Sequence, residues 1–147
     1  MCEIMTIKLV STQITDFWEL IKYALNQVER IGDVEADGVY NRLLAMLLSD
    51  RGQCFVLYSP DKAVKAICIT SILQDEIRGT KTLHIRCLYA FKSAHNDEWA
   101  KEFNTLIDFA RAEGCNKITF ETANQKIKAI VKAIGAVEVS TNMLVEV

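Results

Sequence analysis

The stretch that decides the fold is WAKEFNTLIDFARAEGCNKITFETANQKIKAIVKAIG, residues 99–135. Apolar residues recur over Trp99–Ala112 at the spacing of an amphipathic helix. The run Lys117–Thr122 is typical of a strand, and Asn124 is a favoured N-cap for a second helix. Gly135 is suited to end that helix. The stretch therefore predicts a helix, a strand and a second helix, followed by a terminal strand.

The length and composition of the chain indicate one globular domain, residues 1–147. Half of the 147 residues are apolar and the formal net charge is −2, so nothing indicates a nucleic-acid partner. The start, Met1–Met5, lacks the features of a signal peptide, and no apolar run approaches the roughly 20 residues of a membrane span. We therefore expect no membrane partner and a cytoplasmic location.

The cysteines and histidines indicate neither a disulfide framework nor a metal site. The cysteines are odd in number and lack a C-x-x-C spacing; they are Cys2, Cys54, Cys68, Cys87 and Cys115. The two histidines, His84 and His95, have no ligand cluster around them, so we expect no metal. Most of the thiols are expected to be small core residues, with Cys87 as the first choice for a reactive thiol.

The chain before residue 99 supplies two more helices and four strands. The expected strands are Met5–Val10, Gln53–Tyr58, Ala63–Leu73 and Thr82–Phe91; the helices are one capped by Thr15 or Asp16 and one over about Gly38–Leu48. Short links make the middle strands antiparallel, whereas the helix from Trp99 allows a parallel pairing. We place the strand Thr82–Phe91 at the centre of the sheet. The terminal segment Val137–Val147 is either one strand or a tight hairpin, with an edge to which another copy can pair.

In this element order, Gly114, Asn124 and Gly135 give the chain a pattern that resembles the core of the GNAT N-acetyltransferase superfamily. The resemblance implies an α/β (α+β) fold of the GNAT-like acyl-CoA N-acyltransferase type, in which a mixed, mostly antiparallel central sheet has helices on both faces. It also implies that acetyl-CoA lies where the fourth and fifth strands separate, with its pyrophosphate at the start of the following helix.

The pyrophosphate loop of that family, R/Q-x-x-G-x-G/A, falls on Ala94-His95-Asn96-Asp97-Glu98-Trp99, and no position matches. Asp97 and Glu98 bring negative charge to the first turn of the helix, where it stabilises the helix dipole in place of a ligand's phosphates. Trp99 continues the apolar stripe of its helix as a core residue, or alternatively stacks on a nucleotide base or a partner. The sequence therefore predicts a degenerate cofactor site.

The resemblance also assigns the site residues. Val131 occupies the place of a proton-donating tyrosine, and Ala136 the place of an aromatic residue. The catalytic candidates are Tyr89 and Glu121, with His84 less well placed; we expect His84 to share a strand face with Arg86, opposite Cys87 and Tyr89. A strand bulge would present the amide of Tyr89 or Ala90 to the acetyl group. The cofactor-binding positions are Tyr89, Ala90, Asn96, Asp97, Glu98, Trp99 and Asn124.

Two charged segments have alternative interpretations. The acidic connection from Glu29 to Asp37 is a solvated loop, or it attracts an amine beside the acceptor site. Lys126, Lys128 and Lys132 form a solvated helix face, or they meet an acidic partner or a nucleotide phosphate.

Two functions from different classes follow. The preferred prediction is a GNAT-fold protein with an eroded acetyl-CoA site, a non-catalytic interaction or structural component such as a phage or virion protein. It would bind no cofactor and would act through a protein partner or through self-association. The alternative is an N-acetyltransferase that transfers the acetyl group of acetyl-CoA to a small primary amine by direct attack.

Overall fold

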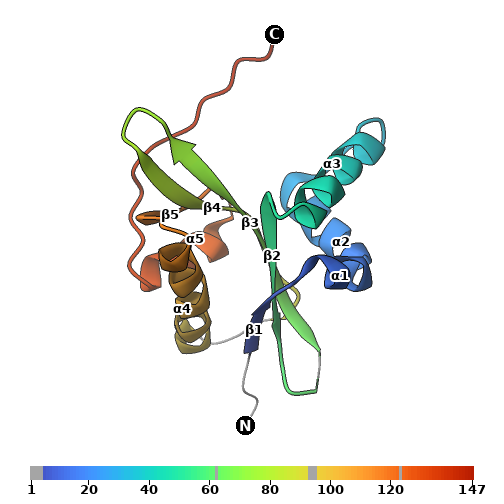
Figure 1. Cartoon of the computed structure of the whole chain (residues 1–147), viewed down its shortest axis with the longest axis horizontal. Coiled ribbons are helices and arrows are strands. Elements are labelled where there is room, and N and C mark those ends of the chain that lie inside the picture. The colour runs from blue at the N-terminus through green and yellow to red at the C-terminus, as the bar shows by residue number, and fades with distance from the viewer. Residues whose placement is uncertain (1–4, 62, 93–95, 123) are drawn as a thin grey trace.

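The computed structural model describes residues 5–61, 63–92, 96–122 and 124–147 (Figure 1). The elements follow in the order β1 (Met5–Lys8), α1 (Ser11–Ile14), a 3-10 turn (Thr15–Phe17), α2 (Trp18–Glu29), α3 (Ala36–Leu48), β2 (Gly52–Tyr58), β3 (Val64–Asp75), β4 (Thr80–Ala90), α4 (Asn96–Ala112), β5 (Lys117–Phe120) and α5 (Gln125–Ala133). In the described part of the chain, no helix is long and apolar enough to span a membrane.

The five strands form one sheet in the order β1-β2-β3-β4-β5. The first three pairings are antiparallel and β4 pairs with β5 in parallel, which confirms the predicted mixed, mostly antiparallel sheet. The central strand is β3. Our placement of the strand Thr82–Phe91 at the centre is wrong, because among the described residues β5 alone lies beyond β4.

Helices cover both faces of the sheet, as predicted (Figure 1). On one face α1, α2 and α3 bury residues such as Ile14, Ile21 and Leu47 against Val56 and Ile67. On the other face Leu106 and Ala110 of α4 pack against the sheet. The buried sheet residues of this cluster are Phe55, Cys68, Leu83 and Ile85. Alternate residues of the strands therefore belong to two separate apolar layers.

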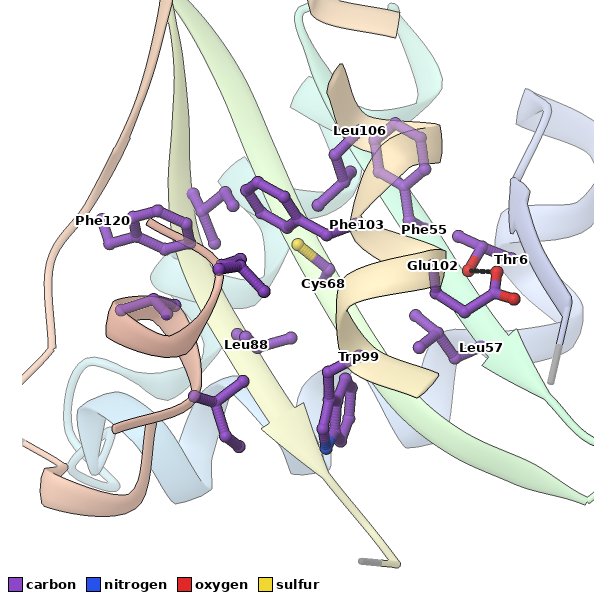
Figure 2. A pocket seen from close by; sticks show the side chains of 14 residues that line it. Thr6, Phe55, Leu57, Cys68, Leu88, Trp99, Glu102, Phe103, Leu106 and Phe120 are labelled. Carbon is purple, nitrogen blue, oxygen red and sulfur yellow. Dashed lines mark hydrogen bonds between the residues drawn. The ribbon is translucent and has the colours of Figure 1, made fainter. Parts of the chain in front are cut away.

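The core under α4 is tightly filled. Figure 2 shows the side chains of α4, α5 and the strands around an apolar void of about 30 Å³, which is room for about one water molecule. At its edge the Thr6 hydroxyl donates a hydrogen bond of 2.6 Å to the Glu102 carboxylate. This contact joins the edge strand β1 to α4.

Two expected boundaries are wrong. The first helical segment begins at Ser11 instead of after Thr15 or Asp16, because the Gln13 side chain accepts a hydrogen bond of 2.9 Å from the Val10 amide and caps the turn. The terminal segment 137–147 forms neither a strand nor a hairpin. Gly135, with φ +103, ends α5 as expected, but the chain that follows pairs with no strand of the described sheet.

A β-bulge in β4 changes which side chains share a face. Cys87 pairs with Ile69 and Ile85 pairs with Thr70, so Arg86 is an extra residue on β4. Ile85 and Leu88 consequently face α4 although they are three residues apart. The resemblance placed this feature at Tyr89 or Ala90, which instead pair regularly with Ile67 and Ala66.

The bulge also corrects our assignment of faces on β4. Before it, Leu83 and Ile85 face α4, so His84 between them faces α2; after it, Cys87 and Tyr89 pack in the α2 layer. Arg86 reaches Glu29 of α2. The expectation that Cys87 and Tyr89 lie opposite His84 and Arg86 is therefore wrong, because it assumed an unbroken alternation.

Four of the cysteines are free and buried, and Cys2 lies outside the described residues. Cys54 and Cys87 are each 1% exposed. Burial raises the pKa of Cys54 to about 12, and burial followed by the charge of Glu29 raises the pKa of Cys87 to about 12. A thiol that stays protonated and covered is a poor nucleophile, so Cys87 is a core residue and not a reactive thiol.

These buried thiols predict a loss of stability in alkali. An unfolded chain releases their protons near the ordinary pKa of 9.0, whereas the folded chain holds them to about 12. Between these values the free energy of unfolding should fall by about 1.4 kcal/mol per pH unit for each thiol. Urea titrations across this range measure the slope. Cys87→Ala should reduce the slope, and Ile77→Ala, at a residue 98% exposed, should leave it unchanged; an unaltered slope in Cys87→Ala contradicts the assignment.

Candidate active site

A cleft opens where β4 and β5 separate. The parallel pairing ends at Ile85 and Phe120, yet β4 continues to Ala90. The space between them has a volume of about 1360 Å³ and is bounded by the end of α2, the second half of β4, the residues after β5 and the first turns of α5. Beyond Ile85 the edge of β4 that faces this cleft has no strand partner among the described residues, so its backbone donors and acceptors are available to a ligand.

The bulge residue Arg86 joins β4 to the end of α2 at this cleft. Its Nε and Nη2 donate hydrogen bonds of 2.9 and 3.0 Å to the two carboxylate oxygens of Glu29. These bonds raise the pKa of Arg86, and burial opposes the shift in part. Such a fork-to-fork contact fixes geometry better than a single ion pair does. Sequence reasoning missed this pair, because Glu29 and Arg86 are far apart in the chain and no motif joins them.

His84 and Glu121 come together on the same wall. The His84 Nδ1 lies 2.9 Å from the Thr119 hydroxyl, and its Nε2 lies 3.8 Å from a carboxylate oxygen of Glu121. The His84 side chain is 14% exposed, whereas that of Glu121 is 64% exposed. The parallel register positions this group, since His84 is paired with Thr119 directly across the strands.

Tyr89, the other catalytic candidate, lies among aromatic rings at the α2 side of the cleft. Its ring makes edge contacts with Tyr23, at 5.8 Å between centroids, and with Phe91, at 5.1 Å. Desolvation and the neighbouring Tyr23 phenol raise the pKa of Tyr89, so its hydroxyl stays protonated at neutral pH. Sequence reasoning missed these neighbours: Tyr23 lies on α2, far from Tyr89 in the chain, and Phe91 lies two residues after it.

The expected cofactor-binding positions fall into two groups. Tyr89, Ala90, Trp99 and Asn124 line the cleft. Asn96, Asp97 and Glu98 lie in the first turn of α4. Ala94 and His95 lie outside the described residues, so the structure says nothing about that part of the loop.

The side chains at two of these positions, Asn124 and Trp99, make contacts within the protein. The Asn124 Oδ1 accepts hydrogen bonds of 2.9 and 3.2 Å from the amides of Lys126 and Ile127, which confirms its expected place at the start of the helix. Trp99 is 8% exposed and packs with Leu57, Ala66 and Ile130. It lines both the apolar void (Figure 2) and the cleft.

The remaining predicted features lie around this arrangement. Val131 is buried on α5, where it lines the apolar void with Trp99. Two residues of the acidic connection make specific contacts. Arg86 donates hydrogen bonds to Glu29, and Glu35 accepts a hydrogen bond of 3.2 Å from the Gly32 amide.

Lys126 alone of the three α5 lysines lines the cleft. Among the described residues no cluster of three or more histidine, cysteine or acidic side chains forms a metal site.

Comparison with known proteins gives no match to a family model and no match to a curated protein. Solved structures do match. A predicted acetyltransferase from Clostridium acetobutylicum, solved with acetyl-CoA, is similar at a TM-score of 0.74 and 13% identity, over 97% of this chain and 96% of that one. A ribosomal-protein-alanine N-acetyltransferase from Brucella melitensis biovar Abortus 2308 has a TM-score of 0.73 at 13% identity, over 98% and 99% of the two chains.

A third similar structure is an aminoglycoside N-acetyltransferase in complex with CoA, with a TM-score of 0.72 and 14% identity over 99% of this chain and 95% of that one. These neighbours overturn our preferred prediction of a non-catalytic interaction or structural component, since they are acetyltransferases and two of them hold CoA or acetyl-CoA. No finding points to a phage or virion role. The chain therefore has the fold of the GNAT N-acetyltransferases, as its element order and glycine spacing implied.

Proposed function

We propose that this chain is an N-acetyltransferase that transfers the acetyl group of acetyl-CoA to a primary amine. The observation that carries the proposal is the cleft of about 1360 Å³ at the point where β4 and β5 separate, in a fold shared with acetyltransferases. A cleft of this size suits a long ligand.

The residues of the cleft fit acetyl-CoA in part. The unpaired edge of β4 offers backbone donors and acceptors that suit a ligand rich in amides. Lys126, at the start of α5, supplies a positive charge for a phosphate. The side-chain oxygen of Asn124 already accepts hydrogen bonds from two amides at the start of α5, so we do not assign Asn124 to the ligand. Asp97 and Glu98 oppose a pyrophosphate at the start of α4, which predicts weaker binding than a neutral helix start would allow.

Acetyl-CoA, when bound, supplies an activated thioester: the C–N bond to the amine forms as the C–S bond breaks, and CoA leaves as its thiol. An amine attacks only when it is neutral, so a base must first take its proton. We assign this role to His84, in the tautomer whose Nδ1 donates its proton to the Thr119 hydroxyl 2.9 Å away, because that tautomer leaves Nε2 as the acceptor. Glu121, 3.8 Å from Nε2, stabilises the imidazolium that results.

Tyr89 is our candidate for the proton donor to the departing thiolate. Val131, in the place where the resemblance implies a tyrosine, has no proton to give. The Tyr89 hydroxyl stays protonated at neutral pH and borders the cleft. Its aromatic neighbours hold the ring in position without a charge that would ionise it.

Binding of acetyl-CoA tests the proposal. Calorimetric titration should give a measurable affinity that weakens with salt, because the ligand is an anion. The double variant Asp97→Asn with Glu98→Gln should bind more tightly by roughly 3- to 30-fold, from about 0.3–1 kcal/mol for each charge removed. Asp108→Asn, further along the same helix, is the matched control and should leave the affinity unchanged. The absence of binding in all three folded proteins would refute the proposed function.

The assignment of His84 is tested by the pH dependence of acetyl transfer, with free CoA thiol as the product that is measured. His84→Ala should lower kcat by about 100-fold or more near neutral pH and remove the fall of the rate in acid. Glu121→Gln should lower kcat less, and Glu113→Gln, on the loop after α4, should leave it unchanged. A wild-type pH profile in a folded His84→Ala protein would show that another group takes the proton.

A further inference from the structure

Arg86 has more hydrogen-bond donors than its partner Glu29 accepts. Its Nε and Nη2 donate to the Glu29 carboxylate at 2.9 and 3.0 Å, whereas no described residue accepts a hydrogen bond from its Nη1. The Arg86 side chain lines the cleft and is 59% exposed. Because the two bonds to Glu29 fix the plane of the guanidinium, its remaining donors are positioned for a planar anion such as a carboxylate.

The groups that we assign to the acceptor amine lie beside Arg86. His84 and Arg86 are two residues apart on β4, which in a strand is roughly 6–7 Å between Cα atoms. The carboxylate of Glu121 is 3.8 Å from the His84 Nε2. Glu29 raises the pKa of Arg86 most, and the charge of Glu121 adds to this effect, so Glu121 is within electrostatic reach of both side chains. A donor for an anion and an acceptor for an amine are therefore neighbours.

The charges of the cleft do not suit an acceptor with several amino groups. Such a polycation binds best where several carboxylates are free. Among the described residues that line the cleft, the carboxylates are those of Glu29 and Glu121, and Glu29 is bonded to Arg86. The cationic side chains that line the cleft are those of Arg30, Arg86, Lys92 and Lys126. Even with Lys126 assigned to the cofactor, positive charge remains for an anionic group on the acceptor.

Two exposed apolar side chains border the same cleft. Val28, on α2, is 38% exposed, and Leu73, on β3, is 50% exposed. Ser71 pairs with His84 and Leu73 pairs with Thr82, so both β3 side chains lie on the face of the sheet that carries His84. An acceptor whose amine meets His84 can therefore place an apolar group against Leu73.

We propose that the acceptor is an α-amino acid with a free carboxylate and an apolar side chain. The donors that Arg86 has left bind the carboxylate, while His84 and Glu121 receive the ammonium group. In an α-amino acid a single carbon separates these two charged groups, which is why a cation and a base must stand side by side. This inference rests on the proposed function and names its acceptor.

The reaction of this acceptor balances without a further reactant. The ammonium first loses one proton to solvent through His84, and the neutral amine then attacks the thioester carbon. The C–N bond forms, the C–S bond breaks, and the second proton of the amine is transferred so that CoA leaves as its thiol. The products are an N-acetyl amino acid and CoA.

Acetyl transfer to matched acids and amides tests the inference on the wild-type protein. Leucine and phenylalanine should each react with a kcat/KM about 10-fold or more above that of leucinamide and phenylalaninamide, which lack the carboxylate. The amines of the amides are less basic and more often neutral, so reactivity alone would favour the amides.

Three results would overturn the inference while acetyl-CoA binding still supports the proposed function. They are equal or better transfer to both amides, better transfer to the polycation spermidine, and binding of acetyl-CoA without transfer to either amino acid. A protein that fails to bind acetyl-CoA refutes the proposed function itself, and the inference with it.

The variant Arg86→Gln locates the carboxylate. It should lower the ratio of kcat/KM for leucine to that for leucinamide from about 10 to near one, mainly through a higher KM for leucine. Arg86→Lys keeps the charge without the planar donors and should retain part of the preference. Arg78→Gln, at a side chain 77% exposed and outside the cleft, is the matched control and should retain all of it. An unchanged ratio in folded Arg86→Gln protein contradicts the assignment, because a purely structural role would affect both substrates equally.

Discussion

The separation of β4 from β5 is the constraint on which the site depends. The two strands pair as far as Ile85 and Phe120, and there β4 gains the extra residue Arg86 and turns away from its partner. A strand edge that has lost its partner must satisfy its backbone groups with something else, and the cleft is the space in which a ligand can do so. The cleft therefore opens where the pairing of β4 with β5 ends, directly beside the bulge.

The same bulge determines which chemistry reaches the cleft. Because Arg86 is extra, His84, Arg86 and Tyr89 all face α2, where an unbroken strand would have divided them between two layers. Glu29 then holds Arg86 through two hydrogen bonds and so fixes the end of α2 against β4. The base and the acid that we assign, His84 and Tyr89, consequently lie on the same face of β4, and Glu121, which follows β5, meets His84 there.

Much of the fold was predictable from the sequence, because the helices and strands carry clear periodicities. Asn124 and Gly135 bound α5 as expected, and the short links gave the antiparallel order of β2, β3 and β4. The terminal strand was not predictable in the same way, since its alternation at Val137–Val147 specifies a strand but not a partner.

The site was harder to predict, and for a physical reason. Tyr89, Glu121 and His84 were identified as candidates, but their faces were assigned by simple alternation, which the bulge breaks. The contacts between Glu29 and Arg86, and between Tyr23 and Tyr89, join residues far apart in the chain and leave no local pattern. Mismatches in the pyrophosphate loop led us to the wrong function, because the start of one helix is only one part of a cleft that several elements line.

The bulge also makes β4 sensitive to changes in its length. Deletion of Arg86, or insertion of a residue beside it, would exchange the environments of Cys87, Leu88 and Tyr89, so that Leu88 moved to the α2 layer while Cys87 and Tyr89 moved to the layer under α4. Single-residue insertions and deletions in this strand are thus far more disruptive than substitutions. Divergence of such a protein should proceed by replacement of side chains within a strand of conserved length.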